Sequence, residues 1–234
     1  MAKILMFGNQ KGGVGKSQCS IMAATALSQP PFNLKTAIID IDDQKSIVFA
    51  RDFDRRSYPE DAVAPFTVLD SSIKDLQKNI AALDKEYQII IIDAAGRLDI
   101  RADVTQQEIT KSLMYVDFLF IPFVAGNHIL TATFNYLQFV QQVREARALS
   151  PRQMTVCGFI NMYRSRTRVN QYLLKDIETL EQSNNLALMK TYLNDYTLFK
   201  EADTFVSIYD VNSNESAKQN FSEWLNELVV FIQQ

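Results

Sequence analysis

The amino-acid sequence predicts an α/β protein with a doubly wound, mostly parallel sheet and helices on both faces, formed as one domain over residues 1–234. Short apolar runs alternate with segments of helical periodicity, which is the pattern of parallel strands joined by crossover helices. Several runs lack polar alternation, and Ile89-Ile90-Ile91-Ile92 is β-branched throughout, as expected for a central strand covered on both faces. No repeat, low-complexity tract or long linker divides the chain.

The predicted strands are the apolar runs Lys3–Gly8, Lys35–Ile41, Phe66–Leu69, Gln88–Asp93, Phe118–Phe123, Thr155–Ile160 and Leu188–Leu193. The predicted helices fill the segments between and after them: Lys16–Ser28, Gln44–Arg56, Ile73–Lys85, Arg101–Tyr115, Thr131–Leu149, Arg168–Gln182 and Ser213–Ile232. Pro30-Pro31 and residues 57–65 are predicted loops, and Asp70-Ser71-Ser72 is typical of a helix N-cap.

The first predicted strand continues into a glycine-rich loop and then an Ala-rich helix. The loop reads Asn9-Gln10-Lys11-Gly12-Gly13-Val14-Gly15-Lys16-Ser17. Glycines let successive backbone N–H groups point at phosphate oxygens, and the helix N-terminus adds its positive dipole end. We expect Lys16 to reach the β- and γ-phosphates of a nucleotide and the Ser17 hydroxyl to bind Mg²⁺.

Two later strands end in carboxylates. The second strand ends in Asp40-Ile41-Asp42-Asp43-Gln44, and the fourth ends in Asp93-Ala94-Ala95-Gly96. Side chains at i and i+2 of a strand share a face, and ligands bind at the carboxyl ends of parallel strands. We expect Asp93 to lie near Mg²⁺, bound through a water. For Asp40 and Asp42 a helix N-cap cluster is the alternative interpretation.

The loop departs from the strict phosphate-loop pattern, because Gln10 replaces the first glycine and Lys11 opens the motif K-G-G-V-G-K-S. With this deviant Walker A motif and the acidic strand ends, the sequence resembles the ParA/MinD class of P-loop ATPases, most closely the small ParA-type DNA partition ATPases. The resemblance implies ATP and Mg²⁺ as cofactors. It implies that Lys11 contacts the nucleotide of a second subunit, that Asp42 orients the attacking water and that Asp40 supports the Mg²⁺ site. The nucleotide-binding residues that it implies are Lys11, Gly12, Gly13, Val14, Gly15, Lys16, Ser17, Gln18 and Asn161, and the metal-binding residues are Ser17, Asp40 and Asp93.

The resemblance weakens toward the C-terminus. Residues 158–163 with Ser165-Arg166-Thr167 are similar to an M-Y-x-x-R-T segment of relatives, which places Asn161 near the adenine. Residues 191–195 stand where relatives have T-x-I-P-R, without its proline and arginine, and Asp43 replaces a family proline in D-x-D-P-Q.

A basic segment follows the sixth predicted strand. Arg164, Arg166 and Arg168 occur at every second position, where guanidinium groups can lie along nucleic-acid phosphates without reading bases. Lys200 is a candidate to extend this DNA-binding patch. The alternative is a solvated turn whose arginines pair with Asp176 or Glu178.

The resemblance implies a DNA-partition ATPase of plasmids or chromosomes. ATP would form a sandwich homodimer that binds DNA without sequence preference, and a ParB-like or other centromere-binding partner would stimulate slow hydrolysis and release. A small-molecule ligase or synthetase on the same fold remains an alternative. A MinD-like positioning ATPase would need basic residues beside the apolar face of its terminal helix, where this chain has Glu223 and Glu227.

Composition sets further limits. The formal net charge of −3 argues against a general basic coat but not against a local basic face. Cys19 and Cys157 lie in separate apolar stretches, which predicts reduced thiols in a cytoplasmic protein and argues against an iron–sulfur carrier. The resemblance to the partition ATPases implies that the protein is nucleoid-associated when it holds ATP. The sequence shows no signal-peptide pattern and no apolar run of membrane-spanning length, so no membrane partner is expected.

Overall fold

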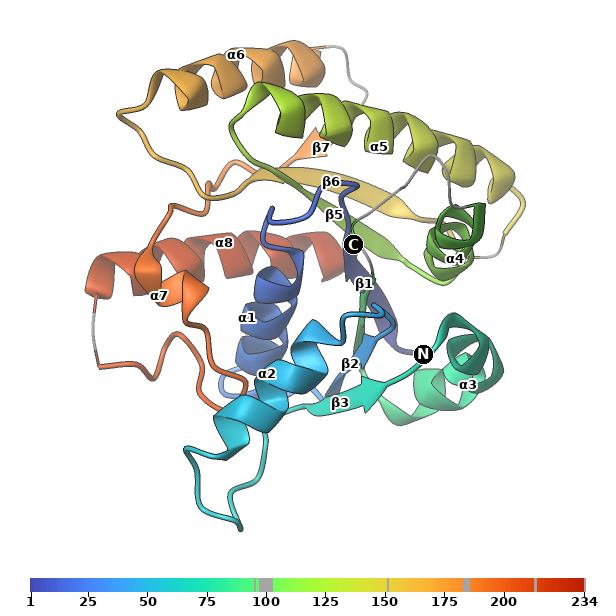
Figure 1. Cartoon of the computed structure of the whole chain (residues 1–234), viewed down its shortest axis with the longest axis vertical. Helices are drawn as coiled ribbons and strands as arrows, with labels where there is room; N and C mark the ends of the chain where they lie inside the picture. Colours follow the sequence, from blue (N-terminus) through green and yellow to red (C-terminus); the bar gives the residue numbers. More distant parts are fainter. Residues whose placement is uncertain (95, 97–102, 151, 183–185, 213, 234) are drawn as a thin grey trace.

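A parallel sheet of seven strands forms the centre of the protein (Figure 1). We describe a computed structural model, which covers residues 1–94, 96, 103–150, 152–182, 186–212 and 214–233. The strands are β1 (Lys3–Phe7), β2 (Thr36–Asp40), β3 (Thr67–Asp70), β4 (Ile89–Asp93), β5 (Phe118–Phe123), β6 (Thr155–Ile160) and β7 (Ala187–Leu188). They are ordered β3-β2-β4-β1-β5-β6-β7, and each neighbouring pair is parallel. The predicted fold class is confirmed.

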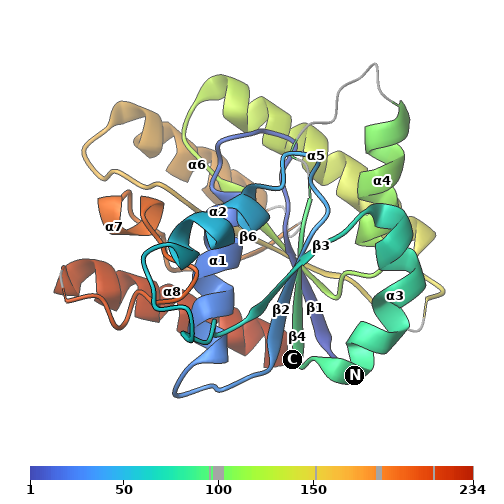
Figure 2. The same ribbon diagram turned by 60° about the horizontal axis from the view of Figure 1, so that its bottom comes forward.

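Helices cover both faces of the sheet. They are α1 (Lys16–Ser28), α2 (Ser46–Arg55), α3 (Ile73–Glu86), α4 (Asp103–Leu113), α5 (Asn127–Ala146), α6 (Arg168–Gln182), α7 (Thr197–Lys200) and α8 (Glu215–Gln233). Side chains of α1, α2, α7 and α8 share one core cluster, and those of α3, α4, α5 and α6 share the other. Figure 2 shows α3 and α4 on one side of β1, β2 and β4, with α1 and α8 on the other.

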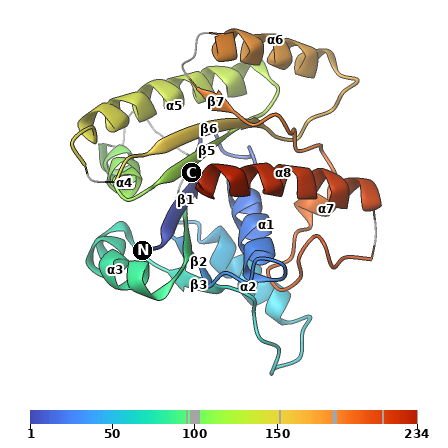
Figure 3. The ribbon, with the colours of Figure 1, turned by 180° about the vertical axis from the view of Figure 1, so that it is seen from behind.

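Helix α1, which follows the glycine-rich loop, lies deep in the protein. Every residue from Cys19 to Leu27 is buried, because α1 is enclosed between the sheet and other helices of the same core cluster, among them α8 (Figure 3). The apolar face of α8 packs on this core, and Trp224 stacks on Phe7 of β1 with ring centroids 6.0 Å apart. The loop that precedes α1 is therefore carried by a firmly packed element.

The last strand is shorter than predicted. The sequence predicted Leu188–Leu193, whereas β7 ends at Leu188. Beyond it, the Glu227 carboxylate of α8 accepts hydrogen bonds from the backbone N–H groups of Lys190 (2.6 Å) and Thr191 (2.9 Å). A side chain 36 residues away from Thr191 thus takes a backbone donor that a sheet ladder would use. Regular pairing with β6 is interrupted there, and the chain bonds to β6 again where the Leu193 N–H donates to Ile160 O at 2.9 Å.

Other boundaries shift by a few residues. Helix α5 begins at Asn127 and not at Thr131, after Gly126 with φ 140°, and α2 begins at Ser46 and not at Gln44. The short helix α7 was not predicted. The predicted starts of two helices, Arg101 and Ser213, lie outside the described residues. Within the described part of the chain, no helix is long and apolar enough to cross a membrane.

Candidate nucleotide-binding site

The carboxyl ends of β1, β2 and β4 meet at a cavity of about 1070 Å³. These strands are neighbours in the sheet, and each is followed by one of the predicted motifs. The cavity is lined by Gln10, Lys11, Gly12, Gly13, Gly15, Lys16, Ser17, Gln18, Asp42, Asp43, Gln44, Ser46, Gly96, Ala132, Met162 and Lys200. Most residues of the predicted phosphate loop therefore surround one space of the size that nucleotide-sized ligands occupy.

The loop backbone has the curvature that a phosphate site needs. Gly13 and Gly15 have φ values of +78° and +87°, in the left-handed region that glycine adopts without strain. Gly15 is the N-cap of α1, and no side chain caps this helix. Its first N–H groups are therefore left for an anion. A Cβ at Gly15 would also lie only 2.5 Å from Asn161 Nδ2.

Two buried asparagines hold the loop in place. Asn9 Nδ2 donates to Pro122 O and to Thr133 Oγ1, both at 2.9 Å, while Asn9 Oδ1 accepts from the Lys11 N–H at 3.0 Å. Asn161 Nδ2 donates to Val14 O at 2.9 Å. No role was predicted for Asn9, although its position as a polar residue directly after a buried strand was the available signal. Asn161 lies against the loop, and its predicted place beside the adenine stays a prediction.

Lys16 is enclosed by the site. Its Nζ donates to Lys11 O at 3.3 Å, and a Cβ at Gly96 would lie 2.2 Å from that Nζ, so only glycine permits this approach. Burial lowers the pKa of the Lys16 ammonium from its usual value, while Asp93 and Asp42 act in the opposite direction. A partly desolvated ammonium beside a glycine-rich loop is well prepared to bind phosphate oxygens.

Ser17 and Asp93 bring together two side-chain oxygen atoms that could bind a metal ion. Ser17 Oγ donates to Asp93 Oδ2 at 2.8 Å. Burial raises the pKa of Asp93 to about 7, opposed by the Ser17 hydrogen bond and Lys16, while Asp40 and Asp42 raise it further. A divalent cation would favour the charged carboxylate.

This donor set fits Mg²⁺, which prefers hard oxygen ligands and keeps several waters and phosphate oxygens around itself. Ser17 would bind the ion directly, and Asp93 would bind it through a water. Among the described residues no group of three or more His, Cys, Asp or Glu side chains could hold a metal ion.

Asp40 is fully buried, and its carboxylate accepts hydrogen bonds from backbone N–H groups of the segment that follows β2. Its Oδ1 accepts from the Asp42 N–H at 3.2 Å, and its Oδ2 accepts from the N–H groups of Ile47 (3.0 Å) and Val48 (3.2 Å). Burial raises the pKa of Asp40, and these bonds and Lys45 counteract the increase. Asp40 therefore fixes the start of α2, as the alternative N-cap interpretation expected, and its support of Mg²⁺ stays a prediction.

Asp42 lies at the cavity in a tight turn. Its Oδ1 accepts from the Gln44 N–H at 3.0 Å, and its carbonyl accepts from the Lys45 N–H at 2.9 Å. Asp43, which replaces the family proline, also lines the cavity. The turn is thus closed by the Asp42 side chain without a proline.

Of the four basic residues predicted to bind DNA, two form ion pairs within the protein and two do not. Arg164 Nε donates to Asp195 Oδ2 at 2.5 Å, and Lys200 Nζ lies 2.7 Å from Asp195 Oδ1. Burial alone would raise the pKa of Asp195, but the bonds from Lys200 and Arg164 outweigh it, so this pKa lies below its usual value. Arg166 and Arg168 are exposed, and neither has an ion-pair partner in the described part of the chain.

These contacts differ from the expected alternative, in which the arginines pair with Asp176 or Glu178. Arg164 pairs with Asp195, a residue 31 positions away in the segment that follows β7. Lys200, predicted only as a DNA contact, also lines the nucleotide cavity.

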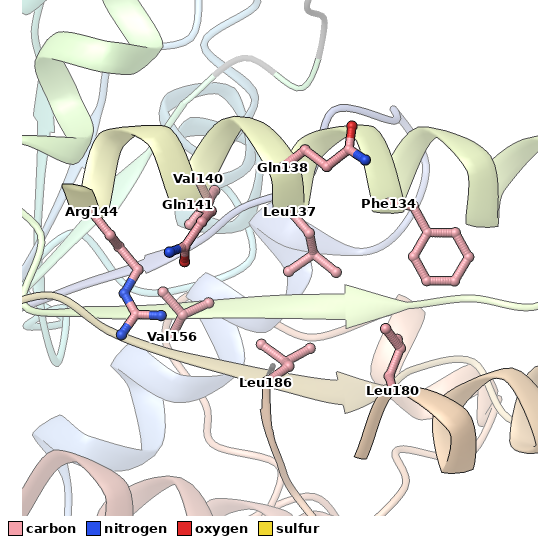
Figure 4. A pocket seen from close by; sticks show the side chains of 9 residues that line it. All are labelled: Phe134, Leu137, Gln138, Val140, Gln141, Arg144, Val156, Leu180 and Leu186. Carbon is pink, nitrogen blue, oxygen red and sulfur yellow. The ribbon is translucent and has the colours of Figure 1, made fainter. Parts of the chain in front are cut away.

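A second cavity, of about 650 Å³, lies beside α5 (Figure 4). Its lining residues come from α5, β6, α6 and the residue before β7: Phe134, Leu137, Gln138, Val140, Gln141, Arg144, Val156, Leu180 and Leu186. This lining contains no carboxylate and no nucleophile, so we assign it no chemistry.

Comparison with known proteins agrees with this geometry. The model of the CobQ/CobB/MinD/ParA nucleotide-binding domain matches residues 5–203. The chain belongs to this family. The matched residues include the whole glycine-rich loop and both acidic strand ends, so the recognised family is confirmed. No curated protein sequence matches the chain.

Solved structures of the family share the fold at low sequence identity. The ATP complex of a single-residue variant of Cyanothece McdA has a TM-score of 0.70 and 17% identity, covering 97% of this chain and 96% of that one. A Borrelia burgdorferi plasmid partition protein bound to AMPPNP has a TM-score of 0.64 and 17% identity, and the match covers 98% of each chain. Mycobacterium smegmatis cobyrinic acid a,c-diamide synthase with ADP and magnesium has a TM-score of 0.67 and 14% identity. This match covers 98% of this chain and 94% of that one.

Proposed function

We propose that the protein is a ParA-type partition ATPase that binds ATP with Mg²⁺, dimerises on ATP and binds DNA without sequence preference. The observation that carries the nucleotide part is the pairing of Ser17 with Asp93 at 2.8 Å beside the enclosed Lys16. That arrangement supplies a cation site and a phosphate-binding ammonium where the glycine-rich loop and the start of α1 meet the end of β4. ATP, AMPPNP and ADP with magnesium in the structural neighbours support the same ligand.

Different residues of the chain have different roles in the proposed hydrolysis. The backbone N–H groups after Gly12 and the Lys16 ammonium bind the phosphates. Ser17, with Asp93 through a water, would hold Mg²⁺, which would supply positive charge beside the phosphate oxygens. Asp42 orients the attacking water, a weak device by itself. Hydrolysis by the isolated protein is therefore slow, and a ParB-like partner that completes the site accelerates it.

Replacing Asp42 tests this assignment. Asp42→Ala should bind ATP but not release phosphate, since the variant keeps the loop and loses the group that positions water. Phosphate release and binding of a fluorescent ATP analogue measure the two properties separately. Asp61→Ala, at an exposed carboxylate in the 57–65 loop, is the matched control. Unchanged phosphate release by the Asp42 variant would contradict the role.

DNA binding is supported by the exposed Arg166 and Arg168, whose guanidinium groups have no partner in the described residues. The double variant Arg166→Glu with Arg168→Glu should lose duplex binding in the presence of ATP, and Arg166→Glu alone should weaken it. Each lost phosphate contact should flatten the log–log salt dependence of affinity by about one unit. Binding across a salt series measures both effects.

Two further variants make this test specific. Lys85→Glu with Lys111→Glu, exposed at the ends of α3 and α4, changes the net charge equally and should leave DNA binding intact. Asp195→Asn should strengthen binding, because it releases Arg164 and Lys200 from their shared carboxylate. A double arginine variant with wild-type affinity and slope would move the DNA face elsewhere.

A ligase on the same fold is the second candidate, favoured by the similarity to cobyrinic acid a,c-diamide synthase at a TM-score of 0.67. The two functions differ in what accelerates ATP hydrolysis. A ligase responds to a small carboxylate together with an amine donor, whereas a partition ATPase responds to DNA and its partner protein. Phosphate release with and without duplex DNA, and with and without cobyrinic acid plus glutamine, separates them.

A further inference from the structure

Helix α2 exposes two large aromatic side chains to solvent. Phe49 and Phe53 are 65% and 69% exposed, and their spacing of four residues puts them side by side on the helix. Asp52 and Arg56 are exposed beside them. We call Phe49, Asp52, Phe53 and Arg56 the α2 stripe. Adjacent exposed aromatic side chains on a helix are typical of an interaction surface.

Residues on the other faces of α2 pack against or hydrogen-bond to the rest of the chain. Ile47 is buried in the core. Arg51 donates to Phe66 O at 3.0 Å, and Asp54 accepts from the Thr204 N–H at 2.9 Å and from Thr204 Oγ1 at 2.8 Å. These contacts fix the rotation of the helix, so the α2 stripe faces outward because the opposite side is anchored.

The charges of the α2 stripe are complementary to each other across a two-fold axis. Asp52 and Arg56 have no ion-pair partner among the residues that the structure describes. If two copies of α2 pack antiparallel near Phe53, the Asp52 of one copy comes within reach of Arg56 of the other, and the reverse pair forms by symmetry. A self-complementary patch of this kind fits a second copy of the same chain.

The α2 stripe is also continuous with the rim of the nucleotide cavity. Ser46, the first residue of α2, lines that cavity and lies one turn before Phe49. The start of the helix is held by Asp40 through the N–H groups of Ile47 and Val48. A second subunit that closes over the nucleotide would therefore meet this face of α2 next.

We propose that the α2 stripe packs against the α2 stripe of a second copy and supplies the apolar anchor of the ATP-dependent dimer. The inference rests on the dimer of the proposed function and names the surface that holds it together. Phe49 and Phe53 provide the buried area, since aromatic side chains dominate interface energies. Asp52 and Arg56 fix the register of the pair.

Sedimentation velocity with AMPPNP over a range of protein concentrations tests the apolar anchor. Phe49→Ser with Phe53→Ser should raise the dimer dissociation constant about tenfold or more, while binding of a fluorescent ATP analogue to the dilute monomer stays at the wild-type level. Val230→Ser on α8, at a side chain 57% exposed, is the matched control and should dimerise as the wild type does.

Charge exchange tests the register. Asp52→Arg alone and Arg56→Asp alone should each weaken dimerisation, and the two changes together should restore it. Failure of the double exchange to recover dimerisation would overturn the antiparallel pairing.

The outcomes separate this inference from the proposed function. A wild-type protein that binds AMPPNP and remains monomeric overturns the dimer of the proposed function together with the α2 stripe. A wild type that dimerises while the Phe49 and Phe53 variant dimerises equally overturns the inference alone. If that variant dimerises but loses acceleration by a partner protein, the α2 stripe belongs to the partner and not to a second copy.

Discussion

Lys16→Ala is expected to abolish measurable ATP binding. The ammonium lies partly desolvated in the loop, where its charge-assisted bonds to phosphate oxygens are strong. Loss of even one such interaction costs about 1.5–3 kcal/mol, and Lys16 is expected to reach both the β- and the γ-phosphate. Titration with a fluorescent ATP analogue measures the effect.

Folding of the Lys16 variant must be controlled separately. Because burial disfavours the Lys16 charge, its removal should not lower the midpoint of thermal unfolding measured without nucleotide. A variant that unfolds like the wild type yet binds ATP within about threefold of wild-type affinity would refute the role of Lys16.

Lys11→Ala is expected to bind ATP as a monomer but to lose dimerisation and about a thousandfold in hydrolysis, the scale on which a cation supplied in trans acts. The Lys11 side chain is exposed at the rim of the cavity and has no partner among the described residues. Its backbone carbonyl instead accepts from Lys16 of the same chain. We propose that this exposed side chain reaches a nucleotide in a facing subunit. Sedimentation with ATP and with ADP, together with phosphate release, measures the result.

Mixing two inactive variants distinguishes action in trans from action within one subunit. In a heterodimer of Lys11→Ala and Asp42→Ala subunits, the nucleotide bound by the Lys11 variant has its own Asp42 and the Lys11 of the other chain. That single site should regain a measurable part of the wild-type hydrolysis. A mixture as inactive as its components, in which the heterodimer is demonstrated by sedimentation, would show that Lys11 acts within its own subunit.

The features that the sequence predicted well are local in the chain. The phosphate loop is a contiguous motif between an apolar strand and a helix, so its residue types and spacing suffice to place Lys16 and Ser17. The inward stripe of α8 follows from helical periodicity alone. The sheet itself follows from apolar runs such as Ile89–Ile92, which is β4 without its last residue.

The features that the sequence could not predict depend on partners far away in the chain. The early end of β7 requires Glu227 to take backbone donors near Thr191. Arg164 and Lys200 both pair with Asp195, which lies in a segment far from Arg164 in the chain. Each is a competition between alternative partners for one group, which only the assembled structure decides.

The order of the strands also ties nucleotide affinity to folding. β4 lies between β1 and β2 in the sheet, although both precede it in the chain. The loop before α1, the turn after β2 and Asp93 therefore meet only after the chain has crossed over and inserted its fourth strand. An unfolded or half-paired chain has no such site, so a nucleotide binds the native state alone and stabilises it by mass action. This stabilisation is about 2.7 kcal/mol when the free ligand is at a hundred times its dissociation constant. For a domain of marginal stability, the cellular nucleotide concentration becomes one of the determinants of how long the protein survives.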